Sequence, residues 1–182
     1  MTLKPLLASL LTLGVVATTL SAPRHRDPLT QAEIDQVRDS SWDPGQRLPL
    51  YVKFARARLV QMETMRADPK AKDRVQQTHD LLDDFQLIYD ELNDNIETYV
   101  DRKDDIRKPL KLVMEADTEF QAKLRALNEA PDVPSSESQH YEFVLSSAIQ
   151  TLDNSSQDHR KLAEEQEESE KHKKAHARKD PP

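Results

Sequence analysis

Residues 75–99, VQQTHDLLDDFQLIYDELNDNIETY, carry the clearest structural signal in this sequence. Apolar side chains recur there at spacings of three and four residues, which is the repeat of one face of an α-helix. Thr78 is the only polar member of this stripe, and Leu81 and Ile88 widen it. Its apolar members are Val75, Leu82, Phe85, Tyr89, Leu92, Ile96 and Tyr99. We therefore expect one helix of about 30 residues, which corresponds to a length of about 45 Å.

Two further helices are predicted before this stretch. A short helix is expected from Thr30 to about Ser41, because Thr30 and Glu33 have the spacing of an N-terminal capping box. A longer helix should follow the turn signal at residues 43–45 and end before Pro69. Its apolar stripe consists of Leu48, Val52, Ala55, Leu59 and Met62.

Two more helices are predicted in the C-terminal half. The first carries a stripe from Ile106 to Leu127, and Pro109 lies near its start or else marks a kink in one longer helix. A loop is expected over residues 130–138. The last helix carries its stripe from Tyr141 to Leu162.

These stripes predict an all-α fold, because the apolar faces of separate helices must pack against one another. The composition agrees, since the chain has 2 glycines and 5% aromatic residues, whereas strand-rich folds use many glycine-containing turns. The simplest arrangement is an antiparallel up-and-down bundle of four long helices with a short N-terminal helix and coiled-coil-like packing. The chain has no cysteine, so its stability would depend on this packing alone.

The two ends of the chain differ from the predicted bundle. Residues 1–22 combine Lys4, an uncharged apolar run and small residues at a cleavage point, which is the pattern of a secretory signal peptide. Residues 23–28 would then form a tether, 29–162 the bundle domain, and 163–182 a charged tail that is either disordered or a fraying helical extension. We therefore expect a periplasmic or extracellular protein that has no stable membrane insertion after cleavage.

Charge and motif content argue against several classes of function. The formal net charge is −7 at pH 7, which disfavours nucleic acid as a partner. The sequence contains no cysteine nucleophile, no glycine-rich nucleophile elbow and no phosphate-binding glycine loop. We therefore expect a protein that is not an enzyme and uses no cofactor.

One spacing in the sequence is compatible with a metal site. Glu137 and His140 have the Glu-x-x-His spacing of helical di-metal proteins. Such sites need this motif twice, and Glu137 would also interact favourably with the N-terminus of the following helix. A metal-binding bundle that combines Glu137 and His140 with carboxylates of residues 80–101 is therefore the alternative to a protein-binding function.

Charge is distributed unevenly between the second and third predicted helices. The second helix is basic, whereas residues 80–101 contain acidic residues and no basic one. We call this group the acidic strip: Asp80, Asp83, Asp84, Asp90, Glu91, Asp94, Glu97 and Asp101. Either the two helices pair their charges, or the strip attracts a basic partner at the face between them.

The candidate partner-binding residues are therefore Asp83, Asp90, Asp94 and Glu97. Trp42, the only tryptophan, is a further candidate. It either caps the end of the bundle core or anchors a partner, because tryptophan is enriched at interfaces.

The stretch Leu29-Thr30-Gln31-Ala32-Glu33 resembles the Leu-Thr-x-x-Gln motif of the small helical periplasmic stress chaperones of the Spy and CpxP type. The resemblance covers five residues, has Glu33 in place of glutamine and is not repeated in the chain. The capping box accounts for the same residues. The resemblance implies a helical surface that holds exposed apolar segments.

We therefore expect an exported, non-enzymatic helical protein that acts through protein–protein contacts, as a scaffold, an adaptor or a chaperone-like module. A homodimer is a further expectation, because the stripe of residues 75–99 is longer than one neighbour can cover if the first helix is not docked.

Overall fold

The structure is a computed structural model that describes residues 26–130 and 133–179. Every regular element in this part of the chain is a helix, and the helices pack together. They are α1 (Gln31–Asp39), α2 (Pro44–Ala67), α3 (Arg74–Asp101), α4 (Arg107–Asn128), α5 (Ser135–Ser138) and α6 (Glu142–Lys179). The predicted all-α fold is therefore confirmed, whereas the predicted signal peptide lies outside the described residues.

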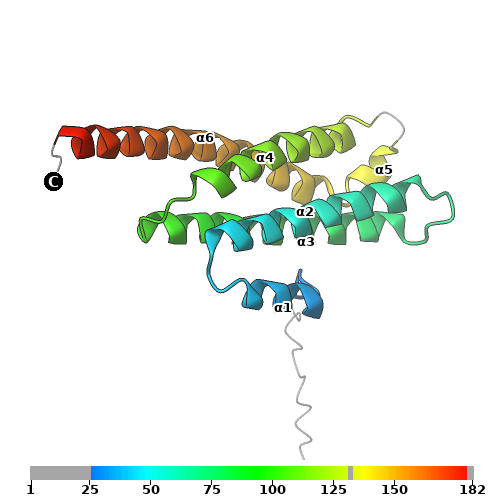
Figure 1. Ribbon diagram of the computed structural model, residues 1–182. Coiled ribbons are helices and arrows are strands. Elements are labelled where there is room, and N and C mark those ends of the chain that lie inside the picture. Colours follow the sequence, from blue (N-terminus) through cyan, green and yellow to red (C-terminus); the bar gives the residue numbers. More distant parts are fainter. Residues whose placement is uncertain (1–25, 131–132, 180–182) are drawn as a thin grey trace, which may run out of the picture.

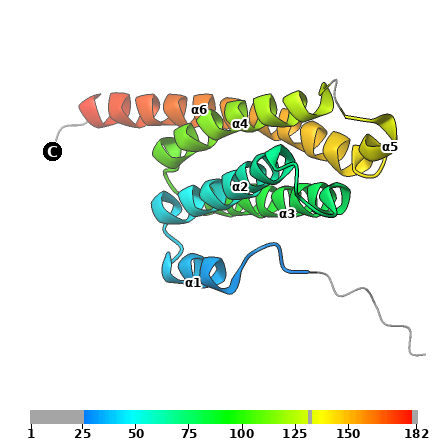
Figure 2. The same ribbon diagram turned by 90° about the vertical axis from the view of Figure 1, so that its right-hand side faces the viewer.

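The helices form layers, which Figures 1 and 2 show from two sides. α2 and α3 lie side by side, α4 and α6 cover one side of this pair, and α1 lies on the other side. α2 contacts α4, and α3 contacts α6. The C-terminal part of α6 extends past the ends of α3 and α4 (Figure 1).

The core lies between these two pairs of helices. The predicted stripe of α3 is buried from Thr78 to Tyr99, whereas Val75 in the first turn is half-buried. Phe120 of α4 packs edge-on against Phe85, with ring centres 5.4 Å apart. Burial of each large apolar side chain contributes about 1.5–3 kcal/mol, so helix packing can hold the fold without a disulfide.

The helix ends follow local sequence signals. The Glu33 amide donates to Thr30 Oγ1 at 3.3 Å, and the Thr30 amide donates to Glu33 Oε2 at 2.8 Å, so the predicted capping box is present. Pro109 is the third residue of α4, where a missing N–H removes no helical hydrogen bond. Because residues 102–106 separate α3 from α4, the alternative of one kinked helix is wrong.

The C-terminal region departs from the sequence-based expectation in one place, because the predicted loop contains a short helix, α5. The charged tail was expected to be either disordered or a helical extension, and α6 continues as a helix to Lys179. Gln166 holds the C-terminal half of α6 to the connection between α3 and α4. It accepts from the Ile106 amide at 3.2 Å and donates to the Asp104 carbonyl at 3.3 Å.

No helix of residues 26–130 and 133–179 is both long and apolar enough to span a membrane.

Candidate functional site

A cluster of buried polar side chains joins α3, α4 and α6. Asp117 of α4 is 1% exposed, and each of its carboxylate oxygens has a different partner. The Tyr89 hydroxyl of α3 donates to Oδ1 at 2.7 Å, and Nδ1 of His159 on α6 lies 2.8 Å from Oδ2. Tyr89 and His159 are themselves 1% and 4% exposed. We call these three residues the Asp117 network.

Asp117 also determines the hydrogen-bonding roles of its two partners. Burial raises the pKa of Tyr89 well above its ordinary value, and the charge of Asp117 and the hydrogen bond to it raise that pKa further. The hydroxyl therefore remains a donor. When Asp117 is ionised, His159 donates from Nδ1, so a neutral imidazole keeps its lone pair on Nε2.

Neither Asp117 nor His159 was among the predicted site residues. Both occupy positions of otherwise apolar stripes, since Asp117 lies between Val113 and Phe120, and His159 follows Leu152 by seven residues. A single ionisable residue within an apolar stripe is the signal that could have identified them. A buried charge needs a partner, so two such residues on different helices are candidates for a pair.

A groove of about 280 Å³ lies between α3 and α6. His159 lines this groove, and we call it the α3–α6 groove. Nε2 of His159 makes no hydrogen bond within the described part of the chain and is not among the polar atoms sealed from solvent. The groove is the solvent-facing cavity that the His159 side chain lines. Most other lining side chains are apolar or acidic, namely Ile96, Val100, Leu162, Asp94, Glu97 and Asp158, and the remaining two are the neutral polar residues Asn93 and Ser155.

The structure brings two of the predicted partner-binding residues into this groove, namely Asp94 and Glu97. Asp83 is exposed and Asp90 is half-buried, and neither lines the groove. Burial raises the pKa of Asp90, and the charges of Asp94 and Glu91 raise it further. The α3–α6 groove has no lining residue from α2, so it is not the predicted face between α2 and α3.

Most basic residues of α2 do not pair with the acidic strip. Arg56 donates to Glu119 of α4 at 2.9 Å, and Arg58 donates to both carboxylate oxygens of Glu33 at 3.0 and 2.6 Å. Within the described residues, the Arg58 Nε to Asp84 Oδ2 distance of 4.0 Å is the one ion pair between α2 and α3. The alternative in which the two helices pair their charges is therefore wrong for most of the strip.

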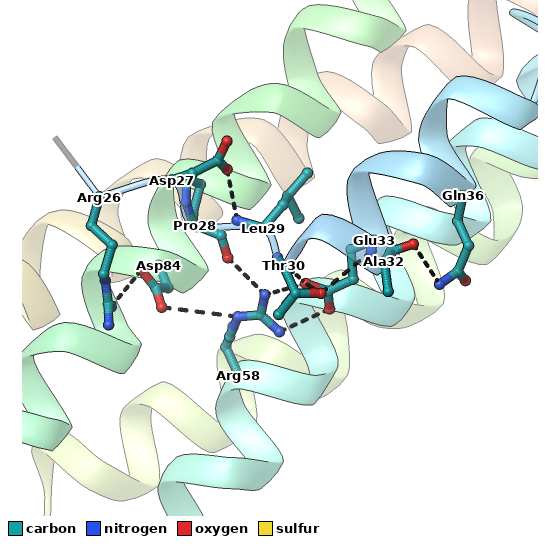
Figure 3. A network of polar contacts seen from close by, with 10 residues as sticks. All are labelled: Arg26, Asp27, Pro28, Leu29, Thr30, Ala32, Glu33, Gln36, Arg58 and Asp84. Atoms are coloured by element: carbon teal, nitrogen blue, oxygen red, sulfur yellow. Dashed lines mark hydrogen bonds and ion pairs between the residues drawn. The ribbon is translucent and has the colours of Figure 1, made fainter.

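Arg58 instead holds the N-terminal part of the described chain against the bundle (Figure 3). It donates to the Pro28 carbonyl at 2.7 Å in addition to its bonds with Glu33. Arg26 forms an ion pair of 2.7 Å with Asp84 of α3. Residues 26–28 of the predicted tether are therefore bound to α2 and α3. We call Arg26, Pro28, Glu33, Arg58 and Asp84 together the Arg58 cluster.

The two carboxylates of this cluster have opposite pKa shifts. Burial opposes ionisation of Glu33, but hydrogen bonds from the Arg58 guanidinium and from Thr30 outweigh it, so its pKa is lowered. Burial raises the pKa of Asp84, and the nearby charges of Arg26 and Arg58 only partly offset that effect. Arg58 therefore stabilises the ionised form of Glu33 more than that of Asp84.

Trp42 does not cap the bundle core. It is 57% exposed, and the Arg47 guanidinium lies over its ring at 4.0 Å from the ring centre. Arg47 is itself buried and donates to the Val37 carbonyl at 3.2 Å. The capping hypothesis is therefore wrong, and a role in partner binding stays a prediction.

The structure does not bring Glu137 and His140 together as metal ligands. The Glu137 carboxylate accepts from Arg66 at 2.9 Å and from Arg74 at 3.4 Å, and this positive environment disfavours a metal cation. His140 is exposed. No group of three or more potential metal-ligating side chains lies close together in the part of the chain that the structure describes.

Comparisons with known proteins do not assign this chain to a family. No protein-family model matches it, and neither curated proteins nor solved structures show a significant match. The resemblance of residues 29–33 to the chaperone motif is therefore not accompanied by a match to a family model.

Proposed function

We propose that this protein is an exported, non-enzymatic binding protein that holds a segment of another protein in the α3–α6 groove. The observation that carries this proposal is the composition of the groove, which combines apolar side chains of both helices with carboxylates. Burial of the apolar side chains would supply affinity, while the carboxylates would select the partner and speed its encounter.

The groove fits one kind of partner best. Its apolar lining from Ile96, Val100 and Leu162 suits the apolar face of a short helical or extended segment. The carboxylates of Asp94, Glu97 and Asp158 favour basic residues in that segment. A short segment held in this way is compatible with an adaptor or a chaperone-like module.

Export and the order of the helices also belong to this proposal. Export is supported by the signal-peptide pattern of residues 1–22. An antiparallel up-and-down order of the four long helices belongs to the proposal, and it is supported by the short connection 68–73 between the neighbours α2 and α3, since short connections favour antiparallel neighbours. The heptad spacing along α3 supports coiled-coil-like packing.

Site-directed photocrosslinking in the native cell tests the proposed groove. A photoreactive phenylalanine analogue at Val100, which lines the groove and is 36% exposed, should form a discrete adduct with one partner. The matched control position is Val60 of α2, which is 45% exposed and does not line the groove. Mass spectrometry should find the Val100 adduct on a segment that contains apolar and basic residues.

Two further outcomes complete this test. The Asp94→Asn/Glu97→Gln variant should reduce the yield of the adduct, because it removes the charges that select the partner. The absence of any adduct at Val100, or identical adducts at Val100 and Val60, contradicts the proposal. Cell fractionation and N-terminal sequencing test export, and a cytoplasmic chain that still begins at Met1 contradicts it.

A further inference from the structure

We propose that the α3–α6 groove recognises a lysine side chain of the bound segment, and that His159 Nε2 is one acceptor for its ammonium group. This inference rests on the proposed function, because it names the chemistry by which the groove would select its partner.

The polar groups of the groove are predominantly hydrogen-bond acceptors. Asp94 and Glu97 of α3 and Asp158 of α6 contribute carboxylates, and no lysine or arginine lines the groove. Asn93 and Ser155 also line it, but Asn93 Oδ1 is sealed from solvent and the Asn93 amide donates to the Ser155 hydroxyl at 3.0 Å, so the carboxylates and His159 are the acceptors that a ligand can reach. A ligand group that carries several donors and a positive charge complements this set, whereas an anion or a second carboxylate would be repelled.

His159 supplies the acceptor whose orientation is best defined. Its ring is 4% exposed, and Nδ1 is held 2.8 Å from Asp117 Oδ2. Asp117 is held in turn by the Tyr89 hydroxyl at 2.7 Å. This chain of bonds fixes the ring of His159 beside the groove that it lines, so an acceptor at Nε2 would lose no further side-chain freedom on binding.

The kinds of acceptor in the groove, an imidazole nitrogen and carboxylates from two helices, favour lysine over arginine. An ammonium group has three donors that can point in different directions, toward the imidazole nitrogen of α6 and the carboxylates of both helices. A guanidinium is a planar fork that best matches the two oxygens of one carboxylate. The methylene stem of lysine can in addition pack against Ile96, Val100 and Leu162, which line the same groove.

A pair of synthetic peptides tests the recognition of lysine. The first is a short alanine-rich helical peptide with one central lysine between two leucines, and the second has norleucine in place of that lysine. Calorimetry with the purified protein should show about tenfold tighter binding of the lysine peptide, which is the effect of one good charge-assisted contact. In the Asp94→Asn/Glu97→Gln variant this preference should fall to about twofold.

The matched control removes the same charge elsewhere. Glu164 and Glu168 line a different groove, between α4 and α6, so the Glu164→Gln/Glu168→Gln variant should keep the full preference for lysine. Equal loss of preference in both double variants would show that only the net charge matters, and this outcome overturns the inference.

Nuclear magnetic resonance of the wild-type imidazole tests the role of His159 without a destabilising substitution. The lysine peptide should shift the Nε2 resonance of His159, while the norleucine peptide should leave it nearly unchanged. An Nε2 resonance that does not respond to saturating lysine peptide removes His159 from the site.

The outcomes separate this inference from the proposed function. If both peptides bind equally and Val100 still forms its adduct, the groove binds a protein segment but does not recognise lysine. If the occupant is instead the lysine-rich end of α6 from a second copy, the protein should sediment as a dimer, and Lys173→Gln/Lys174→Gln should return it to a monomer. That result overturns the proposal that the groove binds a segment of another protein.

Discussion

The Asp117 network and the Arg58 cluster each join three segments of the chain through one charged side chain, but they differ in their distance from water. Asp117 is 1% exposed and is enclosed by α3, α4 and α6. Arg58 has a side chain that is 9% exposed, and its cluster includes Arg26, whose side chain is 61% exposed (Figure 3). The first network is part of the core, whereas the second lies at its edge.

This difference determines what each network contributes. Within the core, a polar group that loses its partner cannot turn to water, so every member depends on the others. At the edge, water can replace part of a lost bond, so the contribution is smaller and more local. We therefore expect the Asp117 network to affect the stability of the whole bundle and the Arg58 cluster to affect the docking of α1.

The largest effect is expected from Asp117→Ala. The substitution leaves the Tyr89 hydroxyl and His159 Nδ1 buried without an acceptor, and each buried donor left unsatisfied costs about 1–3 kcal/mol. Urea unfolding followed by circular dichroism measures the free energy of unfolding. A loss below about 1 kcal/mol would show that water reaches the network, and the contrast with the Arg58 cluster would then disappear.

A triple variant is the control for this interpretation. Tyr89→Phe, Asp117→Leu and His159→Leu together remove every polar group of the network, so no unpaired group remains. Replacement of buried partners by apolar groups is often nearly neutral, so the triple variant should be more stable than Asp117→Ala.

A smaller effect is expected from Arg58→Met. The variant loses the bonds to Glu33 and to the Pro28 carbonyl, and bonds to charged groups of this kind contribute about 1.5–3 kcal/mol. Hydrogen exchange should accelerate mainly in α1. The matched control is Arg56→Met, two positions away on α2, whose side chain is 40% exposed and whose loss should cost at most about 1 kcal/mol. Equal effects of the two variants would contradict the structural role of the cluster.

The pH dependence of stability should differ in sign between the two carboxylates of the Arg58 cluster. Folding lowers the pKa of Glu33, so its contribution is complete above its ordinary value of 4.5 and is lost as the pH falls through the lowered value. Glu33→Gln should therefore destabilise the protein at pH 7 and approach the wild type in acid.

Asp84 should behave in the opposite way. Folding raises its pKa above the ordinary value of 3.8, so its ionisation disfavours the folded state. Asp84→Asn should therefore gain stability relative to the wild type as the pH rises from acid toward neutrality. The free energy of unfolding of Glu33→Gln and Asp84→Asn at several pH values, together with a carboxyl titration by nuclear magnetic resonance, tests these two predictions. If the stability of both variants relative to the wild type changed with pH in the same direction, the opposite pKa shifts of Glu33 and Asp84 would be contradicted.

The smallest effect is expected from Trp42→Ala. Because this side chain is 57% exposed, its removal should change the free energy of unfolding by no more than about 0.5 kcal/mol. The fluorescence of the wild-type protein, which has no other tryptophan, should show the emission of a solvated indole. A core-like emission together with a large loss of stability would restore the capping hypothesis.

Much of the fold could be predicted from the sequence, because its signals are local. The stripe of α3, the capping box at Thr30 and the end of α2 before Pro69 each depend on residues within a few positions of one another. The candidate site was predicted only in part. Asp94 and Glu97 were identified by charge, but they were assigned to the face between α2 and α3 rather than to the α3–α6 groove.

The sequence by itself determined which segments are helices and which faces of those helices are apolar. Capping, proline and side-chain periodicity act within one or two turns, so no tertiary contact is needed to recognise them. The tertiary structure alone decided that Tyr89, Asp117 and His159 meet, since these residues are separated by 28 and 42 positions in the chain. It also decided that α6, and not α2, faces the acidic residues of the groove, because the choice of neighbouring helix depends on how all the apolar faces pack at once.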